Sequence, residues 1–351
     1  MRWRRDRRRD IVNSPRRHAS LGACVLLVAA CTTGNVHQST LHPGGPRAAS
    51  TEHLWWFAFI VATVVYVLTV GALFWAMSRA RRRERDGELL PVDSHEKMKR
   101  SVVLGIAVSV VILLVFLGVD LSVAKTRDPV PKEHPITIEV TGHQWWWDVQ
   151  YADTSAHGRF ETANEIHVPV GQPVLLLLSS TDVIHSLWVP NLAGKKDLIP
   201  GYTQSLWFQA DSAGVYRGQC AEFCGEQHAK MALNIIAQPL DEYRHWVSQQ
   251  QGPGATPTDS MTIRGQEVFL TAPCAMCHAI SGTPAGSHYG PDLTHIASRQ
   301  TLAAGTIPNN RGNLAGWILD PQRIKPGNHM PPNMLEPKDL EALLTYLQSL
   351  K

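Results

Sequence analysis

Two long apolar stretches constrain the fold of this chain more than any other feature of its sequence. They cover residues 54–77 and 102–119, the second extending toward Val123, and neither has a charge in its core. A helix of about 20 apolar residues spans the hydrocarbon core of a bilayer. We therefore predict a transmembrane hairpin over residues 54–125. Two buried core helices of a soluble domain are the alternative, which fits this length poorly.

The segment between the two stretches is strongly basic. Its Lys and Arg residues are Arg79, Arg81, Arg82, Arg83, Arg85, Lys97, Lys99 and Arg100. Because basic loops remain in the cytoplasm, both outer ends of the hairpin should face outward. We expect everything after about Lys125 in the periplasm, or on the outer face of a bacterial cell (inner) membrane.

The N-terminus has the pattern of an export signal over residues 1–30. An Arg-rich head precedes an apolar run that is too short to span a bilayer. The run ends in Val28-Ala29-Ala30-Cys31, which resembles the lipobox of bacterial lipoproteins and implies cleavage before Cys31 and acylation of its thiol. An ordinary signal with a chance cysteine is the alternative. Residues 31–53 then form a linker.

The net charge of +3 does not indicate a nucleic-acid partner. Residues 1–30 hold eight Arg against two Asp, a net of +6, so the remainder carries about −3. Basic residues gathered at one end do not form a stripe on a folded face, so no nucleic acid is expected. Residues 126–250 carry eight Lys and Arg against fourteen Asp and Glu. That acidic balance suits a basic protein donor, although an ordinary solvated surface has the same composition.

Residues 126–247 show short alternating apolar runs separated by turn residues, a pattern that predicts an all-β sandwich or barrel. The runs cover residues 136–140, 165–170, 174–179, 202–208 and 232–237. Residues 248–260 have no apolar period and indicate a flexible linker. Within residues 261–351, helical spacing predicts a small all-α domain, with helices over 262–270, 314–319 and 337–350. Its few apolar side chains suggest that it needs a prosthetic group.

The sequence Cys274-Ala-Met-Cys277-His278 is the attachment signature of a c-type haem. Two thiols add to the haem vinyl groups, and the adjacent histidine becomes the proximal iron ligand. A redox dithiol or half a zinc site is the alternative, but this domain has no second Cys pair nearby. Met330 is the predicted distal ligand, because prolines rigidify the loop after it. The rivals are Met334, His288, His295 and His329.

The predicted β-region holds a second cluster of metal-ligating residues. Its members are His185, Cys220, Cys224, His228 and Met231. Two thiolates, two imidazoles and a thioether favour copper, since hard cations prefer oxygen ligands and structural zinc seldom uses Met. A disulfide between Cys220 and Cys224, with ordinary packing of the others, is the alternative. The five side chains together are far more specific than any one alone.

The stretch from Leu54 to about Val247 resembles subunit II of cytochrome c oxidases, whose motif C-x-E-x-C-G-x-x-H-x-x-M with an upstream His is matched throughout. The resemblance implies a cupredoxin-like β-barrel behind a two-helix membrane hairpin, with a binuclear copper centre, CuA. It implies as ligands Cys220 and Cys224 as bridging thiolates, His185 and His228 as one imidazole per copper, Met231 as a weak ligand, and the backbone carbonyl of Glu222. It also places the Glu222 side chain near a magnesium at the border with subunit I.

The family places an aromatic cluster where electrons enter, and Gly142-His143-Gln144-Trp145-Trp146-Trp147 matches it, with Trp145 as the candidate. Alternation on one strand would put Trp145 and Trp147 on one face and Trp146 on the other. Ordinary packing of all three is the alternative. The family often has Glu followed three residues later by Trp for proton uptake. Here Lys99 follows Glu96, so a solvated loop charge is the better interpretation.

The resemblance continues beyond the linker. Residues 290–295 (Gly-Pro-Asp-Leu-Thr-His) and 325–331 (Lys-Pro-Gly-Asn-His-Met-Pro) are similar to the fused c-type cytochrome of caa-type oxidases. The family likeness implies electron flow from an external cytochrome c to the fused haem c, to CuA and to a haem in subunit I, which reduces dioxygen and pumps protons. Subunit I is the expected partner, together with subunit III.

Neither centre has an open coordination position, so both should carry electrons without reducing dioxygen themselves. One alternative is the CuA-bearing subunit of a nitric oxide reductase, which the partner's sequence would distinguish. Another is a stand-alone membrane-anchored electron carrier, which would not need a two-helix hairpin. Second subunits of quinol oxidases share the fold, but the retained copper ligands argue against that function.

Overall fold

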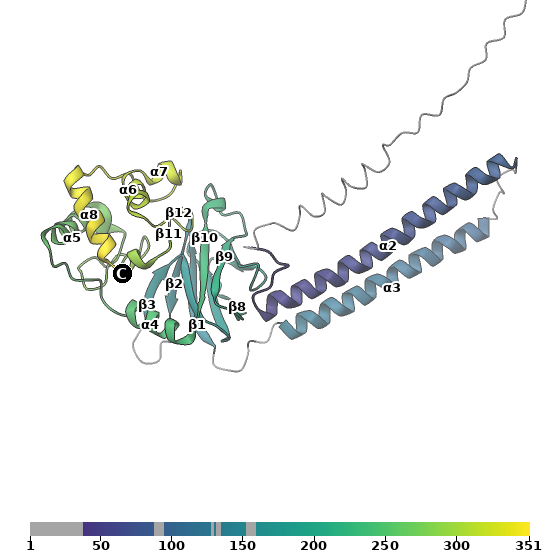
Figure 1. Cartoon of the computed structure of the whole chain (residues 1–351), viewed down its shortest axis with the longest axis horizontal. Helices are drawn as coiled ribbons and strands as arrows, with labels where there is room; N and C mark the ends of the chain where they lie inside the picture. The colour runs from purple at the N-terminus through teal and green to yellow at the C-terminus, as the bar shows by residue number, and fades with distance from the viewer. Residues whose placement is uncertain (1–37, 88–94, 128–129, 131–134, 152–158) are drawn as a thin grey trace, which may run out of the picture. The chain divides into compact units, whose positions relative to one another are not determined.

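A computed structural model describes residues 38–87, 95–127, 130, 135–151 and 159–351. The predicted signal peptide and Cys31 lie outside these described residues. Three parts follow one another along the described chain: a helical hairpin, a β-domain of two sheets, and a small helical domain (Figure 1). This succession confirms the predicted fold class.

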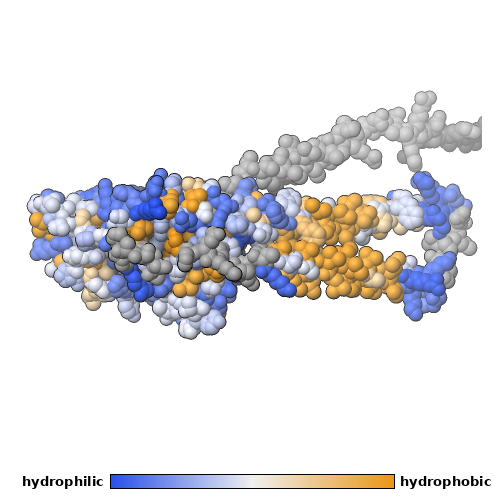
Figure 2. Space-filling model, turned by 90° about the horizontal axis from the view of Figure 1, so that it is seen from below, coloured by the Kyte–Doolittle hydropathy of each residue, from blue (hydrophilic) through white to orange (hydrophobic). Residues whose placement is uncertain are grey.

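The hairpin consists of α2 (Pro46–Arg85) and α3 (His95–Arg127). The two helices run side by side (Figure 1), and the rings of Phe57 and Phe116 meet at 5.2 Å between centroids. Figure 2 shows a continuous hydrophobic surface along the hairpin, bounded by hydrophilic residues at its loop end. Both helices are long and apolar enough to cross a membrane. The expected linker over residues 31–53 is partly wrong, because α2 already begins at Pro46, a residue type that suits the first turn of a helix.

The β-domain contains two mixed five-stranded sheets. The first has the order β3-β2-β1-β5-β8, with β1 (Ile136–His143), β2 (Trp146–Tyr151), β3 (Phe160–Ala163), β5 (Val174–Ser180) and β8 (Gln204–Phe208). The second has the order β4-β10-β9-β6-β7, with β4 (Glu165–Pro169), β6 (His185–Trp188), β7 (Lys196–Leu198), β9 (Gly214–Cys220) and β10 (Ala232–Gln238). The pairs β1·β5 and β4·β10 are parallel.

Alternation along the strands builds the core of this domain. Strand β5 buries Val174, Leu176 and Leu178 completely, while the residues between them are partly exposed. These side chains share one apolar cluster with Ile235 of the second sheet, so the core joins both sheets. The alternation of apolar residues in the sequence thus determines which side chains of each strand face the core.

The tryptophan run does not follow a single strand, so the prediction of alternation along one strand is wrong. Strand β1 ends at His143 and β2 begins at Trp146, which places Trp145 in the turn between them. Trp147 is fully buried, whereas Trp146 stacks on His143 with 4.4 Å between ring centroids. Alternation therefore describes only the last two residues of the run.

Helix α4 (Leu240–Gln250) closes the β-domain. Its Trp246 stacks on His167 of β4 at 4.0 Å between ring centroids, and Tyr243 is buried beside it. The helix continues through Gln250, which is buried, so residues 248–250 belong to a helix and not to the predicted linker. Gln is a good helix former, and packing of this amphipathic face continues the helix beyond the last apolar residue of the sequence pattern.

The helical domain contains α5 (Ser260–Thr271), α6 (Arg311–Leu319), α7 (Pro321–Ile324) and α8 (Pro337–Ser349). The Asp259 carboxylate caps α5 by accepting the backbone N–H groups of Met261 and Thr262. Gly265 lets α5 pack closely on α8, because a Cβ there would collide with the backbone of Ala342. One two-residue ladder, β11 (Thr301–Leu302) with β12 (Ile307–Pro308), interrupts the otherwise helical domain.

Candidate metal and haem centres

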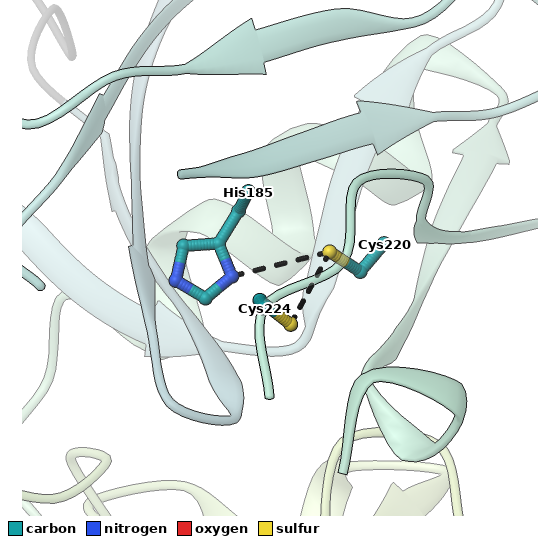
Figure 3. Close-up of side chains that lie close together, drawn as sticks. All are labelled: His185, Cys220 and Cys224. Carbon is teal, nitrogen blue, oxygen red and sulfur yellow. Dashed lines mark hydrogen bonds between the residues drawn. The ribbon is translucent and has the colours of Figure 1, made fainter. Parts of the chain in front are cut away.

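The β-domain brings the predicted copper ligands together from separate elements. His185 opens β6, Cys220 ends β9, and Met231 directly precedes β10. Strands β6 and β9 are hydrogen-bonded neighbours, so His185 lies beside Cys220 although 35 residues separate them. His228 lies in a short 3-10 helix between the second thiol and Met231. Figure 3 shows His185, Cys220 and Cys224 grouped with their donor atoms facing one another.

The donor atoms surround the two thiols. The Cys220 sulfur lies 3.9 Å from Nδ1 of His185 and 3.7 Å from the Cys224 sulfur. The Cys224 sulfur lies 3.7 Å from Nδ1 of His228 and 3.9 Å from the Met231 sulfur. All five predicted side chains therefore converge on one place.

The two cysteines are free thiols and not a disulfide. Their sulfurs lie 3.7 Å apart, far beyond the bond length of about 2 Å. The hydrogen bond between Cys220 and Cys224 lowers the pKa of Cys220. Burial opposes this effect and His185 adds to it, so a thiolate is accessible near neutral pH. Thiolate, imidazole and thioether donors together suit copper, so this chemistry fits the implied centre.

Asp182 orients the first of the histidine candidates. Its Oδ1 lies 2.8 Å from Nε2 of His185, so the carboxylate accepts the Nε2–H and leaves Nδ1 facing the thiols. It also accepts the backbone N–H groups of Gln144 and Val183, each at 2.6 Å. Burial alone would raise the pKa of Asp182, but the hydrogen bonds from His185 and these N–H groups lower it to about 2. Sequence reasoning missed Asp182, and the available signal was an acid three residues before a predicted ligand.

Gly142 makes room for the same imidazole. A Cβ at this position would lie 2.8 Å from Cδ2 of His185, so any larger residue would displace the ring. Burial lowers the pKa of His185, but its hydrogen bonds with Asp182 and Cys220 outweigh that effect and raise it. The hydrogen bonds of the ring thus fix its orientation, and the missing side chain at Gly142 leaves the room that the ring occupies.

Glu222 contributes its backbone and its side chain in different directions. Its carbonyl oxygen lies 3.2 Å from the Cys220 sulfur, beside the cluster, as the predicted carbonyl ligand requires. Its carboxylate is half-exposed and lies 3.5 Å from Nζ of Lys195. The carboxylate therefore lies at the surface, where another chain can reach it.

A cavity of about 370 Å³ adjoins the haem-attachment motif. Cys274, Cys277 and His278 line it, as does Met330. Both thiols are free, and the short 3-10 helix Pro273–Met276 spaces them along one turn. Buried apolar side chains such as Phe269 complete the lining, which suits the apolar faces of a porphyrin.

His278 is held in the orientation that an iron ligand needs. Its Nδ1 lies 2.7 Å from the carbonyl oxygen of Pro291, so the ring donates from Nδ1 and leaves Nε2 free. Burial lowers the pKa of His278, which favours the neutral imidazole that binds a metal. A Cβ at Gly290 would lie 2.7 Å from the ring, so this glycine leaves room for the imidazole.

The structure separates the two methionine candidates for the distal position. Met330 lines the cavity, and its loop is fixed because its N–H donates to Asn328 and its carbonyl accepts from Gln322, both at 2.8 Å. The Met334 side chain is 94% exposed and is not among the lining residues. The geometry therefore supports Met330.

The histidine rivals differ in their surroundings. His295 has both ring nitrogens hydrogen-bonded to backbone carbonyls, those of Lys351 and Gly252. His288 lies 2.9 Å from the Glu161 carboxylate and does not line the cavity. His329 does line the cavity, with its ring 6.3 Å from that of Trp145. Of these three histidines, His329 is thus the one that the geometry keeps as a rival.

Arg299 fits the carboxylate groups of a haem. It lines the cavity, is 9% exposed, and its Nε has no hydrogen-bond partner among the described residues. Burial lowers its pKa, which shows that the environment is unfavourable for an isolated cation. A haem propionate would supply the missing acceptor. Sequence reasoning did not identify Arg299.

Trp145 lies between the two candidate centres. Its indole N–H donates to the backbone carbonyl of Cys224 at 2.9 Å, and the residue also lines the haem cavity. Only 7% of its surface is exposed, because Lys325 and His329 of the helical domain lie against it.

Glu96 is an exposed residue of the first turn of α3.

The fold and the two clusters define a class of protein. The chain combines a two-helix membrane hairpin, a β-domain with a thiolate, imidazole and thioether cluster, and a helical domain with a haem-attachment motif. The family model "Cytochrome C oxidase subunit II, periplasmic domain" matches residues 154–238, and the model "Cytochrome c" matches residues 263–351.

Relatives extend this match over nearly the whole chain. "Cytochrome c oxidase subunit 2" of Alkalihalophilus pseudofirmus is 36% identical over 95% of this chain and 97% of its own length. The protein of the same name from Bacillus sp. strain PS3 is 28% identical over 94% of this chain and 96% of its own. The crystal structure of the periplasmic domain of cytochrome oxidase subunit II from Bradyrhizobium japonicum shares 33% identity, covering 35% of this chain and 97% of that one, with a TM-score of 0.33. The chain belongs to the cytochrome c oxidase subunit 2 family and carries a fused cytochrome c domain, which confirms the predicted resemblance.

Proposed function

We propose that this subunit conducts electrons from an external cytochrome c, through the fused haem c domain and the CuA domain, to subunit I. Dioxygen would be reduced to water there, and the same partner would pump protons. The two metal groups supply one-electron exchange when bound. The chain's own residues hold them, exclude water and fix the distance between them.

One observation carries the proposal: Trp145 adjoins both predicted sites. It lines the haem cavity, and its indole N–H is bonded to the carbonyl of Cys224, a predicted bridging ligand. One buried aromatic residue therefore links the cavity to the ligand backbone without intervening solvent. Trp145 would thus receive electrons from the fused domain and not directly from an external donor.

We assign the copper ions, the haem and the magnesium to sites by the residues that would hold them. His185, Cys220, the carbonyl of Glu222, Cys224, His228 and Met231 would hold two copper ions. Cys274, Cys277, His278 and Met330 would hold the haem. The half-exposed Glu222 carboxylate would reach a magnesium at the boundary with subunit I.

The hairpin and family membership make this a membrane-anchored subunit of a haem-copper oxidase, with its β- and helical domains outside the membrane. We place it in the bacterial inner membrane with those domains on the periplasmic or outer face, as a partner of subunit III as well as subunit I. The basic end of the hairpin would lie in the cytoplasm. Cys31 would carry a lipid.

Three other functions remain as contrasts. A "Quinol oxidase subunit 2" of Bacillus cereus is 26% identical over 61% of this chain, but the complete copper cluster described above argues for a cytochrome c oxidase. A nitric oxide reductase would be recognised by the chemistry of its large subunit. A stand-alone carrier would purify from detergent without haem a and without a large membrane subunit.

Replacing Cys224 with Ser tests the proposed path. A hydroxyl is harder and far less acidic than a thiol and cannot replace a bridging thiolate on copper. In the purified complex, the variant should retain covalent haem c that external reduced cytochrome c still reduces, while oxygen consumption falls by orders of magnitude. Rapid-mixing spectroscopy should show haem c reduced and the subunit I haem oxidised.

Cys277→Ser is the reciprocal control. It alters haem attachment in the other domain and should leave the copper–thiolate spectrum intact, since the two centres use separate cysteine pairs. If the subunit I haem is reduced at the normal rate in Cys224→Ser, electrons bypass the copper site and the proposed order is wrong.

A further inference from the structure

Lys325 is a buried cation with an unusual pair of partners. It belongs to the helical domain, is 3% exposed, and donates from Nζ to the backbone carbonyl of Trp145 at 2.7 Å. A second carbonyl, that of Ala303, lies 3.3 Å from the same nitrogen. Burial lowers the pKa of Lys325 to about 7, which indicates how unfavourable this place is for an ammonium group. A lysine buried in this way does not contribute to solubility as a surface lysine does.

The surrounding segment is seated on the loop that carries the copper ligands. Gln227 Nε2 donates to the carbonyl of Pro326 at 2.7 Å, and Lys230 Nζ donates to that of Ile324. Gly327 lies so close to the Glu226 carboxylate that a Cβ there would collide with it. The helical-domain loop of residues 324–327 thus rests on residues 226–230, between Cys224 and Met231.

The direction of these hydrogen bonds distinguishes Lys325. Gln227 and Lys230 extend from the β-domain to backbone carbonyls of the helical domain, whereas Lys325 extends the opposite way. Its target is the carbonyl of Trp145, whose indole N–H is bonded to Cys224. Five residues after Lys325 the same loop reaches Met330, which lines the haem cavity.

We infer that Lys325 is a positioning residue for electron transfer: it fixes the backbone of Trp145 against the loop that carries Met330 and so sets the separation of the haem and copper sites. This inference rests on the function proposed above. Electron tunnelling weakens steeply with distance, so a looser contact between the two domains slows transfer without altering either centre. Lys325 lines the haem cavity and interacts electrostatically with Cys224, but its hydrogen bonds among the described residues go to the carbonyls of Trp145 and Ala303 and not to a predicted metal ligand, so its role is to position.

The test uses the complete oxidase complex with Lys325→Met, which keeps the length of the side chain and removes its N–H donors. Lys338→Met is the matched control, because Lys338 is exposed in the same domain. Three quantities are measured: the haem c and copper–thiolate spectra, the rate at which external cytochrome c reduces haem c, and the first-order rate of copper-centre reduction by haem c after rapid mixing.

In Lys325→Met the spectra and the external step should match the wild type, while transfer between the centres slows about tenfold. That factor corresponds to about 1.4 kcal/mol, near the low end of what a hydrogen bond from a charged donor contributes. Turnover should then show a lower kcat with an unchanged kcat/KM for the donor. Lys338→Met should behave as wild type.

A second variant guards against misfolding of the helical domain. Lys230→Met removes a donor to the same loop from the β-domain side and leaves the helical domain unchanged in sequence. Because Lys230 is exposed, its loss should slow transfer only about twofold. Wild-type transfer in a spectroscopically intact Lys325→Met would overturn the inference, as would equal slowing in Lys338→Met. Absence of any transfer from haem c to copper in the wild type would instead refute the proposed function itself.

Discussion

Replacing Asp182 with Asn should weaken the copper centre while leaving the fold intact. The asparagine keeps the shape of the side chain but loses the charge. Its amide would have to present oxygen both to the His185 Nε2–H and to the two backbone N–H groups that the carboxylate accepts now. The imidazole then loses the partner that directs Nδ1 toward the thiols.

The magnitude follows from two routes. A pKa lowered from 3.8 to about 2 corresponds to at most roughly 2 kcal/mol in favour of the ionised carboxylate, at about 1.4 kcal/mol per unit, and solvent screening of this exposed residue reduces it to about 1 kcal/mol. Loss of an outer partner of a ligating histidine typically weakens metal binding by about 10- to 100-fold, or about 1.4 to 2.7 kcal/mol. We therefore expect copper affinity to fall by about one to two orders of magnitude, the range typical for loss of such an outer partner.

Competition with a copper chelator, followed by the copper–thiolate absorption band, measures this loss. Asp241→Asn is the matched control, because that side chain is 96% exposed and distant from the cluster in sequence. Wild-type affinity in Asp182→Asn would show that the carboxylate does not orient His185. An equal loss in the control would show that general charge, and not this contact, is responsible.

In the metal-free protein, the lowered pKa of Asp182 should make the stability of the fold depend on pH. Because the folded pKa of Asp182 is lowered, its contribution to stability is present above the unfolded value of about 3.8 and disappears as the pH falls through about 2. Denaturant titrations of wild type and Asp182→Asn should therefore differ by about 1 kcal/mol near neutral pH, after allowance for solvent screening, and converge in strong acid. A difference that persists unchanged below pH 2 would contradict the assignment.

Two further predictions concern the haem ligand and the topology. Met330→Ala should keep covalent haem but lose the methionine-to-iron charge-transfer band, and survival of that band with its loss in Met334→Ala would reverse the assignment. A membrane-impermeant thiol reagent should label a cysteine introduced at Ser260 in intact spheroplasts but not one introduced at Asp86, because the proposed orientation places only Ser260 outside. Both positions are exposed in the structure, so burial would not prevent labelling. Labelling at Asp86 alone would invert the orientation.

The sequence carries the hairpin, the β-domain and the ligand identities because each leaves a local pattern. Apolar length predicts α2 and α3, and the spacing from Cys220 to Met231 names most of the copper cluster before any fold is known. What it lacks are relations between distant residues. Trp145 lies in a turn because β1 and β2 pair as a hairpin, a register that alternation of three tryptophans cannot reveal.

The supporting residues follow the same rule. Asp182 and Gly142 act on His185 through space, and Gly142 does so from β1 of the first sheet whereas His185 opens β6 of the second. The unpaired Nε of Arg299 becomes visible only once the cavity is seen to enclose it. The end of α4 was missed because its Gln-rich residues have little periodic signal, and tertiary packing decides their conformation.

The cover over Trp145 has a kinetic consequence. Trp145 is buried beneath the fused domain, so on the proposed path a diffusing donor would meet only the haem domain, and the second step would be unimolecular. Tethering replaces donor concentration with an effective concentration set by the docked geometry. Ionic strength should therefore control how fast the complex fills with electrons, because encounter depends on screened charges. It should leave unchanged the rate of the second, internal transfer.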